Sequence, residues 1–539
     1  MKIYVPSKTF INGAFCGLVL FSLLINVWGI NWGLPSFNGW AADELTPIRV
    51  LEAVEQGFAN GWHYKYPPFH FYVLTLVYSP VLLLHKLGVV NVYSLPTYTL
   101  LFYIGRVLSL IMAAGILGII YRIGQEIYDK KSAFFAAVIA SLNLPFIYYA
   151  KTINLDIPYL FWFMLSLFFY IRLLKEQKTR DYVLFAATAA IAVATKDQAY
   201  AFYFLTPGFI LWQHYRYLQQ RDPSITLKTA LKDRKIVLSL GVGIALFLGI
   251  HNIIFNLNGF FAHVNDITSG GATISPRFER SLSGHLTMFW QSLRHIRVSF
   301  GWLLYGVCML GLLKTFWQRK HYYLFCLLIP IVSYYLFFVS IVMYNALRYL
   351  FPVCLILAFF GGKVIGDFLT PSAQLFRVKV LSVIAVFIYT FFYATSVNVL
   401  LTHDSRYQVE QWMAKTLTSS NFILGAGDAK YLPRLEKFSS ESFKRPTLET
   451  LKQKNPDYII GTSAYDSRRF EPGTPEYEFF SKLETEKLGY DLVFQYKAKP
   501  QWDLLNHEEL GYRHINRMYV YSNFDKINPE IKIYRKSRQ

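Results

Sequence analysis

Two acidic positions in the chain lie beside long apolar runs, and the first of them could supply a general base. Asp43 and Glu44 form a pair shortly after the first apolar run, and Asp156 stands two residues before Pro158. A carboxylate close to an apolar interface is costly unless it has a role, and it could deprotonate a hydroxyl group. The structural alternatives are that the pair opens a helix and that Asp156 caps one.

Four basic residues near the same apolar runs could hold a phosphate group. Lys65 precedes two prolines, Lys196 lies between two short apolar runs, Arg106 lies within a run and Arg348 begins another. Arginine binds phosphate through paired hydrogen bonds, and lysine binds it as a point charge. The alternatives are a snorkelling lysine at 65, a salt bridge between the ends of two half-helices at Lys196-Asp197, and an interior ion pair for Arg106.

Other motifs that would define a cofactor site are missing from the sequence. The histidines that invite a metal interpretation follow no strong ligand spacing such as HExxH; they are His251, His263, His285 and His295. The sequence also lacks a P-loop, a Rossmann glycine motif and a serine nucleophile elbow. It therefore defines no metal ligand set.

The composition is typical of a protein that crosses a membrane many times. The 539 residues include 54 Lys and Arg against 34 Asp and Glu, for a net charge of +20, and 54% are hydrophobic while 16% are charged. Soluble domains carry about a quarter charged residues, so the composition argues against a soluble enzyme and excludes disorder. Because the basic residues stand in short clusters between apolar runs, a membrane is favoured over nucleic acid as the partner.

About eleven apolar runs approach the roughly 20 residues that a membrane span requires. The first run, 10–30, carries no charge, and we interpret it as an anchor helix instead of a signal peptide. The other predicted spans are 99–121, 132–151, 157–174, 182–195, 198–213, 235–255, 297–316, 322–342, 347–365 and 379–400.

The basic residues in short loops predict an orientation with a cytoplasmic N-terminus and an outer C-terminus. All the basic clusters then fall on the cytoplasmic side, and they include Lys2, Lys8, Arg122, Lys130, Lys131, Lys175, Lys178, Arg180, the stretch 214–235, Arg319, Lys320, Arg377 and Lys379. This orientation requires the apolar run 69–87 to lie at the outer interface, and the alternative is a true span.

The composition changes abruptly after residue 400, which predicts two domains. Residues 1–400 form the membrane domain, with outer segments at 31–98 and 256–296, and residues 401–539 form a small α/β domain outside the membrane. The expected elements of the outer domain are a helix at 404–416 and strands at 421–425, 457–461, 491–496 and 517–521.

These features, in this order, resemble the GT-C superfamily of membrane glycosyltransferases. The likeness is strongest to the protein O-mannosyltransferase group (glycosyltransferase family 39-like), which includes the lipid A aminoarabinose transferase. It rests on Asp43-Glu44, Lys65-Tyr-Pro-Pro68, Arg106-Val-Leu-Ser109, Asp156, Thr195-Lys196, Arg348-Tyr-Leu-Phe-Pro352 and Asp404-Ser-Arg-Tyr407. The resemblance implies an all-α polytopic GT-C membrane domain, with about eleven transmembrane helices, followed by a small extracytoplasmic α/β domain.

The resemblance also implies a reaction. A sugar would pass from a polyprenyl-phosphate or dolichyl-phosphate donor to a protein, lipid or glycan acceptor on the outer face, by single displacement with inversion. Asp43 would be the general base, Glu44 would support it or bind acceptor, and Asp156 would be the second acid of the site. The implied contacts to the donor phosphate are Lys65, Lys196, Arg348 and Arg106.

The chain departs from its implied relatives near Lys65. The aminoarabinose transferase has an acid before the lysine of its Lys-Pro motif and uses it with a histidine for metal, whereas Tyr64 stands there in this chain. The resemblance therefore implies no definite cofactor and leaves a divalent metal as an open alternative. The chain has no Asn-x-Ser/Thr sequon and no ER-retention tail, which favours a bacterial inner membrane.

Two other classes of protein would explain part of the pattern. A transporter or flippase of a lipid-linked sugar would spread acids and cations through the membrane midplane, often on related repeats. A receptor-like membrane protein would explain the C-terminal domain but not the convergence of Asp43, Lys65 and Asp156. Because no repeat is evident and the acids stand near outer span ends, the sequence favours the enzyme.

Overall fold

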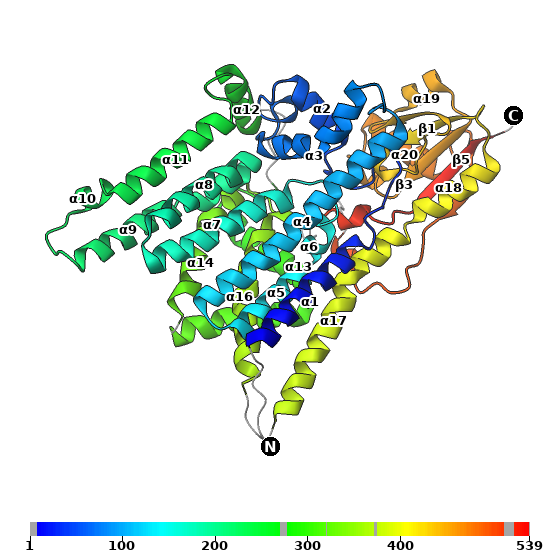
Figure 1. The fold of residues 1–539 in the computed structure, drawn as a ribbon. Coiled ribbons are helices and arrows are strands. Elements are labelled where there is room, and N and C mark those ends of the chain that lie inside the picture. The colour runs from blue at the N-terminus through cyan, green and yellow to red at the C-terminus, as the bar shows by residue number, and fades with distance from the viewer. Residues whose placement is uncertain (1–7, 270–276, 320, 371–374, 511–521, 538–539) are drawn as a thin grey trace. The chain divides into compact units, whose positions relative to one another are not determined.

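The structure is a computed structural model that describes residues 8–269, 277–319, 321–370, 375–510 and 522–537 (Figure 1). The predicted cytoplasmic residues Lys2 and Lys320 and the expected strand 517–521 lie outside the described residues. The chain divides into two compact units. The helical unit is Met1–Val27, Pro47–Val90 and Leu101–Ala394, and the sheet unit is Trp28–Thr46, Asn91–Leu100 and Thr395–Gln539.

Helices make up the described part of the helical unit. They are α1 (Lys8–Val27), α2 (Pro47–Glu55), η1 (Trp62–Tyr64), α3 (Phe69–Lys86), α5 (Lys130–Ser141), α6 (Leu144–Tyr149), α7 (Asp156–Glu176), α8 (Thr179–Thr195), η2 (Asp197–Tyr203), α9 (Thr206–Gln219), α10 (Leu227–Leu231), α11 (Arg234–Ile250), α12 (Leu257–Ser269), α13 (Leu282–Gln318), α14 (Tyr322–Tyr334), η3 (Tyr335–Val339), α15 (Ser340–Val342), η4 (Leu347–Leu350) and α16 (Phe351–Phe368). The boundaries between the units fall inside α4 (Leu95–Ile127) and α17 (Phe376–Thr402).

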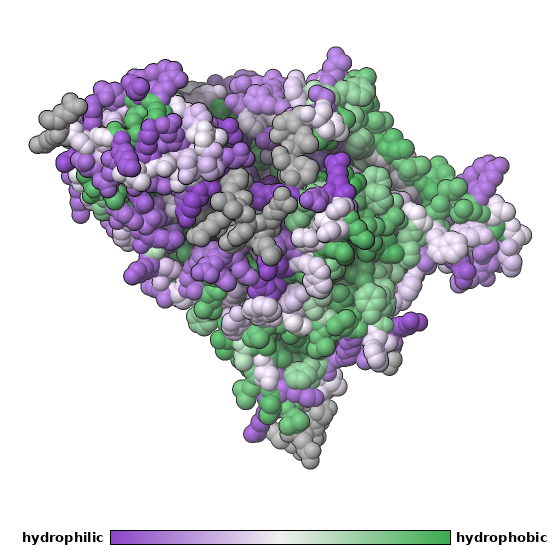
Figure 2. Space-filling view, turned by 180° about the vertical axis from the view of Figure 1, so that it is seen from behind, coloured by the Kyte–Doolittle hydropathy of each residue, from purple (hydrophilic) through white to green (hydrophobic). Residues whose placement is uncertain are grey.

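Six helical segments of the described residues are long and apolar enough to cross a membrane. They are Leu95–Ile127, Asp156–Glu176, Leu282–Gln318, Tyr322–Val342, Leu347–Phe368 and Phe376–Thr416, and Asn12–Val27 is a shorter apolar helix. Large apolar side chains such as Leu240, Trp302 and Leu381 are more than 60% exposed, and Figure 2 shows hydrophobic residues over much of the surface of the helices. The chain is an integral membrane protein with a polytopic helical domain, as the fold class predicted, while the count of about eleven spans stays a prediction.

Proline and asparagine divide two of the predicted spans into shorter helices. The run 132–151 forms α5 and α6, with Asn143 at the N-cap position of α6 and Pro145 in its first turn. The run 198–213 forms η2 and α9, which begins at Thr206 with a proline in its first turn. Proline suits the first turn of a helix because it has no backbone N–H to leave unpaired.

Glycines bring the helices around α16 into close contact. An added Cβ at Gly362 would lie 2.5 Å from the backbone nitrogen of Ala136 on α5, and one at Gly311 of α13 would lie 2.3 Å from the carbonyl oxygen of Phe360. Small residues let membrane helices approach at backbone distance. These glycines explain why α16 packs between α5 and α13.

The sheet unit is a five-stranded sheet covered by helices. Its elements are α18 (Ser405–Thr416), β1 (Phe422–Ala426), η5 (Ala429–Tyr431), β2 (Ser439–Phe443), α19 (Leu448–Lys454), β3 (Tyr458–Thr462), η6 (Ser467–Arg469), α20 (Pro475–Glu484), β4 (Tyr490–Tyr496), α21 (His507–Leu510), η7 (Phe524–Lys526) and β5 (Ile531–Lys536). The strand order is β2-β1-β3-β5-β4; β1 pairs in parallel with β2 and β3, while β5 is antiparallel to β3 and β4. The predicted α/β character of the C-terminal region is confirmed.

Alternation along the strands divides the core of this unit between two faces of the sheet. Ile423 and Ile460 pack with Met413 of α18, whereas Leu424 and Ile459 pack with Phe479 and other α20 residues. The helices of the unit therefore cover both faces of the sheet (Figure 1).

The segment Trp28–Thr46 is fastened to the C-terminal region within the sheet unit. Trp32 donates from Nε1 to Oδ2 of Asp404 at 3.0 Å, and Arg434 donates from Nη1 to the carbonyl oxygen of Leu34 at 2.6 Å. Ala42 belongs to the same core cluster as the α20 residues. This segment carries Asp43 and Glu44, so their surroundings come from residues far along the chain.

Candidate functional site

Asp156 is the first residue of α7, and its side chain is fully buried. Its backbone N–H donates to Oδ1 of Asn154 at 2.7 Å, which turns the chain into the helix. The carboxylate is 0% exposed. Asp156 stands in the first turn of α7, where a negative charge is favoured, and the N-cap position belongs to Leu155. Its predicted alternative role as a helix cap is wrong.

Lys196 forms an ion pair with Asp156. The Lys196 Nζ atom lies 2.5 Å from Oδ1 of Asp156, and the lysine side chain is 15% exposed. Lys196 has extended backbone geometry between α8 and η2, which lets it reach α7 from the break between two helices. The alternative pairing of Lys196 with Asp197 is not the one observed. The structure thus brings together two of the residues selected from the sequence.

The second carboxylate oxygen of Asp156 accepts no hydrogen bond from the residues that the structure describes. This oxygen, Oδ2, is buried. A buried acceptor without a donor costs about 1–3 kcal/mol. The arrangement therefore offers a hydrogen-bond acceptor to a ligand beside a partly accessible ammonium group.

Tyr159 joins the Asp156–Lys196 pair to Arg348. Tyr159 lies about one helical turn after Asp156 on α7. The Lys196 Nζ atom lies 5.2 Å from the centroid of its ring. Both Asp156 and Arg348 interact electrostatically with the Tyr159 side chain. Arg348, in η4, also lies over the ring of Tyr349 at 5.4 Å. Three of the predicted site residues therefore share Tyr159 as a neighbour.

His263 of α12 links the loop before Lys65 to the residue after Lys196. Its Nε2 atom lies 2.8 Å from Oδ1 of Asp197, and its Nδ1 atom lies 2.5 Å from the carbonyl oxygen of Tyr64. Burial disfavours the protonated imidazole, but the hydrogen bond and the charge of Asp197 outweigh it, so the pKa of His263 is raised. The positions of Lys65 and Lys196 are thus connected through one histidine.

The loop that leads to Lys65 has an unusual backbone. Phe58, Asn60, His63 and Tyr64 all have positive φ, between 47° and 56°. Non-glycine residues avoid this region, and such strain gathers at functional sites. The Lys65 side chain itself is exposed, and its Nζ atom lies about 6 Å from two aromatic rings, those of Trp62 and Tyr66.

Arg106 lies on α4 close to the segment that precedes Asp156. It is 1% exposed, and its guanidinium lies 5.7 Å from the Phe102 ring. At the neighbouring Gly105, an added Cβ would lie 2.6 Å from Ile153. The helix backbone therefore approaches the 151–156 segment next to this arginine.

Asp43 and Glu44 belong to the sheet unit. Helix α2 begins at Pro47 without an acid in its first turn, so the alternative in which the pair opens a helix is wrong. Asp43 has φ of 59° and an exposed side chain, and Asn523 donates from Nδ2 to its Oδ2 at 3.4 Å. Glu44 is fully buried, and its carbonyl oxygen accepts from Lys430 Nζ at 3.0 Å.

Lys526 and Tyr431 complete the surroundings of Asp43. Lys526 Nζ lies 5.4 Å from the ring of Tyr431 and donates to Oδ1 of Asn523 at 3.3 Å. Burial raises the pKa of the Tyr431 phenol; Lys526 opposes this and Asp43 adds to it. Asp43 is therefore a solvent-accessible carboxylate held in a partly cationic environment.

The other histidines do not gather around the site. His251 and His295 each bond through Nδ1 to a carbonyl oxygen of their own helix, and His285 is exposed. Within the described ranges there is no group of three or more His, Cys, Asp or Glu side chains that could hold a metal ion.

Several site neighbours escaped sequence reasoning. Tyr159 carried a usable signal, because a residue three positions after Asp156 lies on the same helix face. His263 was noticed only as one of four histidines, and nothing local marks Asn523 or Lys526 as neighbours of Asp43. The contact between Asn523 and Asp43 joins positions 480 residues apart in the chain.

Comparison with known proteins supports the membrane glycosyltransferase class that the sequence predicted. Residues 102–232 match the family model described as dolichyl-phosphate-mannose-protein mannosyltransferase. The matched segment contains Arg106, Asp156 and Lys196. The predicted resemblance to the membrane glycosyltransferases is confirmed over this segment, and the match indicates an enzyme of the glycosyltransferase type.

Two solved structures illustrate the proteins that the chain resembles in three dimensions. ArnT from Cupriavidus metallidurans bound to undecaprenyl phosphate aligns with 12% identity and a TM-score of 0.48, over 98% of each chain. The Archaeoglobus fulgidus oligosaccharyltransferase tethered to an acceptor peptide aligns with 11% identity and a TM-score of 0.47, over 89% of this chain and 72% of that one. A search of curated proteins gave no match.

Proposed function

We propose that this enzyme transfers a sugar from a lipid-phosphate donor to an acceptor on the extracytoplasmic face of the membrane. The observation that carries the proposal is the buried Asp156, with one oxygen paired to Lys196 and the other without a partner among the described residues. A sugar hydroxyl would supply the missing hydrogen bond. A phosphate would find the positive charge of Lys196, with Arg348 nearby through Tyr159.

The family description names a dolichyl-phosphate-linked mannose as donor. We extend this to the chain as a lipid-phosphate sugar, without assigning the sugar. Lys65 is exposed and follows the strained loop tied by His263 to Asp197, so it could contact the same phosphate as Lys196. Arg106, on the helix beside the 151–156 segment, would add positive charge.

The proposed chemical step is a single displacement at the anomeric carbon. The acceptor hydroxyl oxygen attacks that carbon while the bond from the carbon to the phosphate oxygen breaks, and the lipid phosphate leaves with the bonding electrons. Asp43 takes the hydroxyl proton, and the basic residues stabilise the charge that forms on the phosphate. One displacement inverts the configuration of the sugar.

The general-base role is assigned to Asp43 because its side chain is exposed, unlike that of Asp156. An exposed carboxylate can reach an acceptor that enters from solvent, and the left-handed backbone at Asp43 fixes its direction. Glu44 is buried, so we assign it a supporting role for the loop. The acceptor could be a protein, a lipid or a glycan.

The test is a donor panel with protein purified into lipid. Polyprenyl phosphates carrying mannose, glucose, galactose, N-acetylhexosamine or pentose are incubated with a membrane extract as acceptor source. Release of polyprenyl phosphate is followed by mass spectrometry. Wild type should consume at least one donor, and Asp43→Asn should reduce turnover about 100-fold or more.

Asp491→Asn is the matched control, because Asp491 is an exposed carboxylate of the same unit that bonds to Ser537. This variant should keep wild-type turnover. Full turnover by Asp43→Asn would refute its role as base. If the donor moved across the membrane of sealed vesicles and no product formed, the protein would be a transporter of lipid-linked sugar instead of a transferase.

A further inference from the structure

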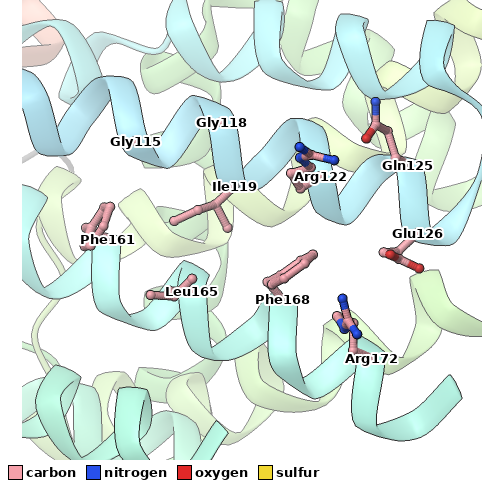
Figure 3. A pocket seen from close by; sticks show the side chains of 10 residues that line it. All are labelled: Gly115, Gly118, Ile119, Arg122, Gln125, Glu126, Phe161, Leu165, Phe168 and Arg172. Carbon is pink, nitrogen blue, oxygen red and sulfur yellow. The ribbon is translucent and has the colours of Figure 1, made fainter. Parts of the chain in front are cut away.

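A groove runs between α4 and α7 in the helical unit, apart from the residues used above (Figure 3). Its volume is about 590 Å³, within the range of small-molecule pockets. Two glycines of α4 shape it. An added Cβ at Gly118 would meet no atom within 4 Å, whereas one at Gly115 would lie 2.6 Å from the Phe161 ring. Gly115 thus lets the helices meet, and Gly118 leaves the space open.

The walls of the groove are apolar, and both belong to long apolar helices. Figure 3 shows Ile119 on α4 above Leu165 and Phe168 on α7. Both helices are among those long and apolar enough to span a membrane. A groove in such a position is in contact with lipid, so the occupant that fits its walls is a hydrocarbon chain.

One end of the groove is polar. Arg122, Gln125 and Glu126 of α4 and Arg172 of α7 line it. Arg172 lies eleven residues after Phe161, which corresponds to about 16 Å along the helix. The groove therefore has the form of a lipid site, with a long apolar part and polar groups at one end.

The charges at this end do not cancel. Arg172 pairs with both Glu176 and Asp181 at 3.2 Å, and Glu126 pairs with Lys175 at 2.7 Å. Lys178 also pairs with Glu176.

Arg122 is exposed and has no ion pair with any residue that the structure describes. Its guanidinium is the unneutralised charge of the groove. It can bind phosphate through two parallel hydrogen bonds. Gln125 lies three residues after Arg122, on the same face of α4.

The polar end is remote from the proposed sugar site. Arg172 lies sixteen residues after Asp156 on the same helix, or about 24 Å away. A donor whose phosphate lies at Lys196 cannot place that phosphate at Arg122 as well. In the predicted orientation the arginine end faces the cytoplasmic leaflet, where anionic lipids attract basic residues.

We infer that the α4–α7 groove binds an anionic glycerophospholipid, with one acyl chain along Ile119 and Phe168 and the phosphate on Arg122. The site is separate from the sugar donor site and belongs to the opposite leaflet. Its occupant is a structural lipid that fills the space left by Gly118 between two helices of the site-bearing unit.

The experiment measures retained lipid on the full-length protein. Protein is exchanged into detergent with an equimolar mixture of phosphatidylglycerol and phosphatidylcholine of identical chains, washed, and analysed by native mass spectrometry. Wild type should retain phosphatidylglycerol in preference to phosphatidylcholine. Arg122→Gln should weaken retention of phosphatidylglycerol about tenfold, because a charged hydrogen-bond partner of the phosphate is lost.

Two further variants separate the headgroup from the chain. Gly118→Leu places a side chain in the open space and should reduce retention of both lipids, while Gly118→Ala should reduce it less. Arg216→Gln removes another exposed arginine, from α9, outside the groove, and should retain lipid as wild type does. Equal retention of the two lipids by wild type, equal losses in Arg122→Gln and Arg216→Gln, or unchanged retention in Gly118→Leu would each overturn the proposal.

Discussion

Two buried aspartates, one in each unit, have opposite hydrogen-bond environments. Asp404 of the sheet unit uses both oxygens: Oδ1 accepts from the Arg406 backbone N–H and Nε, and Oδ2 accepts from Trp32, Arg406 and the Asn528 N–H. Asp156 of the helical unit bonds to Lys196 through Oδ1, while Oδ2 has no partner among the described residues. Both side chains are 0% exposed.

The difference separates a carboxylate that holds a fold together from one that is arranged for a ligand. The guanidinium of Arg406 lies 4.1 Å from the Trp40 ring and 5.3 Å from the Trp32 ring, so the ion pair is enclosed by aromatic residues. Lys196 keeps part of its side chain exposed, so its charge can be shared with another anion. Burial alone therefore does not distinguish the two roles, and the state of the second oxygen does.

The largest effect is expected from Asp404→Ala. The substitution leaves Arg406 buried without its counter-ion, which should lower the free energy of unfolding by about 3–5 kcal/mol. Thermal unfolding of purified protein measures the change. The control is Glu478→Gln, which breaks an exposed pair with Lys482 and should cost less than about 1 kcal/mol. Similar losses in the two variants would remove the distinction between the enclosed and the exposed pair.

A smaller effect on stability, but a large one on turnover, is expected from Asp156→Asn. Asparagine keeps the shape but loses the charge that fixes Lys196, so turnover should fall about 10²–10³-fold. The unfolding midpoint should change less than in Asp404→Ala, because Lys196 reaches solvent. Sugar transfer and thermal unfolding are measured on the same preparations.

A double-mutant cycle sharpens this result. Because Asp156 and Lys196 act as a pair, Asp156→Asn with Lys196→Met should lose much less activity than the two single losses multiplied together. Strictly multiplicative losses would show that the two residues act independently.

The smallest effect concerns the pH dependence of stability at His263. Its folded-state pKa is raised above the ordinary value of about 6.5, so the contribution of the His263–Asp197 pair is fully present below pH 6.5. It is lost as the pH rises through the folded-state pKa. The unfolding midpoint of wild type should exceed that of His263→Gln most at pH 5.5 and least at pH 8.5.

The size of this difference is limited because Asp197 is 28% exposed, and such pairs contribute at most about 1 kcal/mol. His285→Gln is the matched control, since His285 is exposed and lies in the same predicted outer segment. A constant difference between wild type and His263→Gln at all pH values would exclude titration of this pair.

The fold was predictable wherever hydrophobicity dominates the local sequence. The span 157–174 became α7, the span 347–365 became η4 and α16, and three of the predicted strands became β1, β3 and β4. Strand β2 was missed because Ser439–Phe443 is polar and lies at the edge of the sheet. Strand β5 was missed although its buried Ile531 and Ile533 flank the charged Lys532, and this alternation of apolar and charged residues was a usable signal.

The candidate site was predictable as a set of residue types, but its pairings were not. The choice of Asp156 and Lys196 rested on their places at span ends, whereas the contact between them depends on the packing of α7 against α8. A salt bridge at Lys196-Asp197 was only the structural alternative, and in the fold Asp197 pairs with His263 while Lys196 pairs with Asp156, because residues brought close by the fold compete with a neighbour in sequence. The role of Asp43 stays a prediction.

The bond between Trp32 and Asp404 has a consequence for biosynthesis. The two residues are 372 positions apart, so at about 5–20 residues per second a ribosome needs roughly 20–70 s to deliver the second after the first. During that time the segment around Asp43 has been made but lacks its bonds to Asp404 and to the later residues Arg434 and Asn523. The proposed base therefore reaches its final setting only after nearly every membrane helix has been inserted, and a chain interrupted before Asp404 would remain catalytically silent.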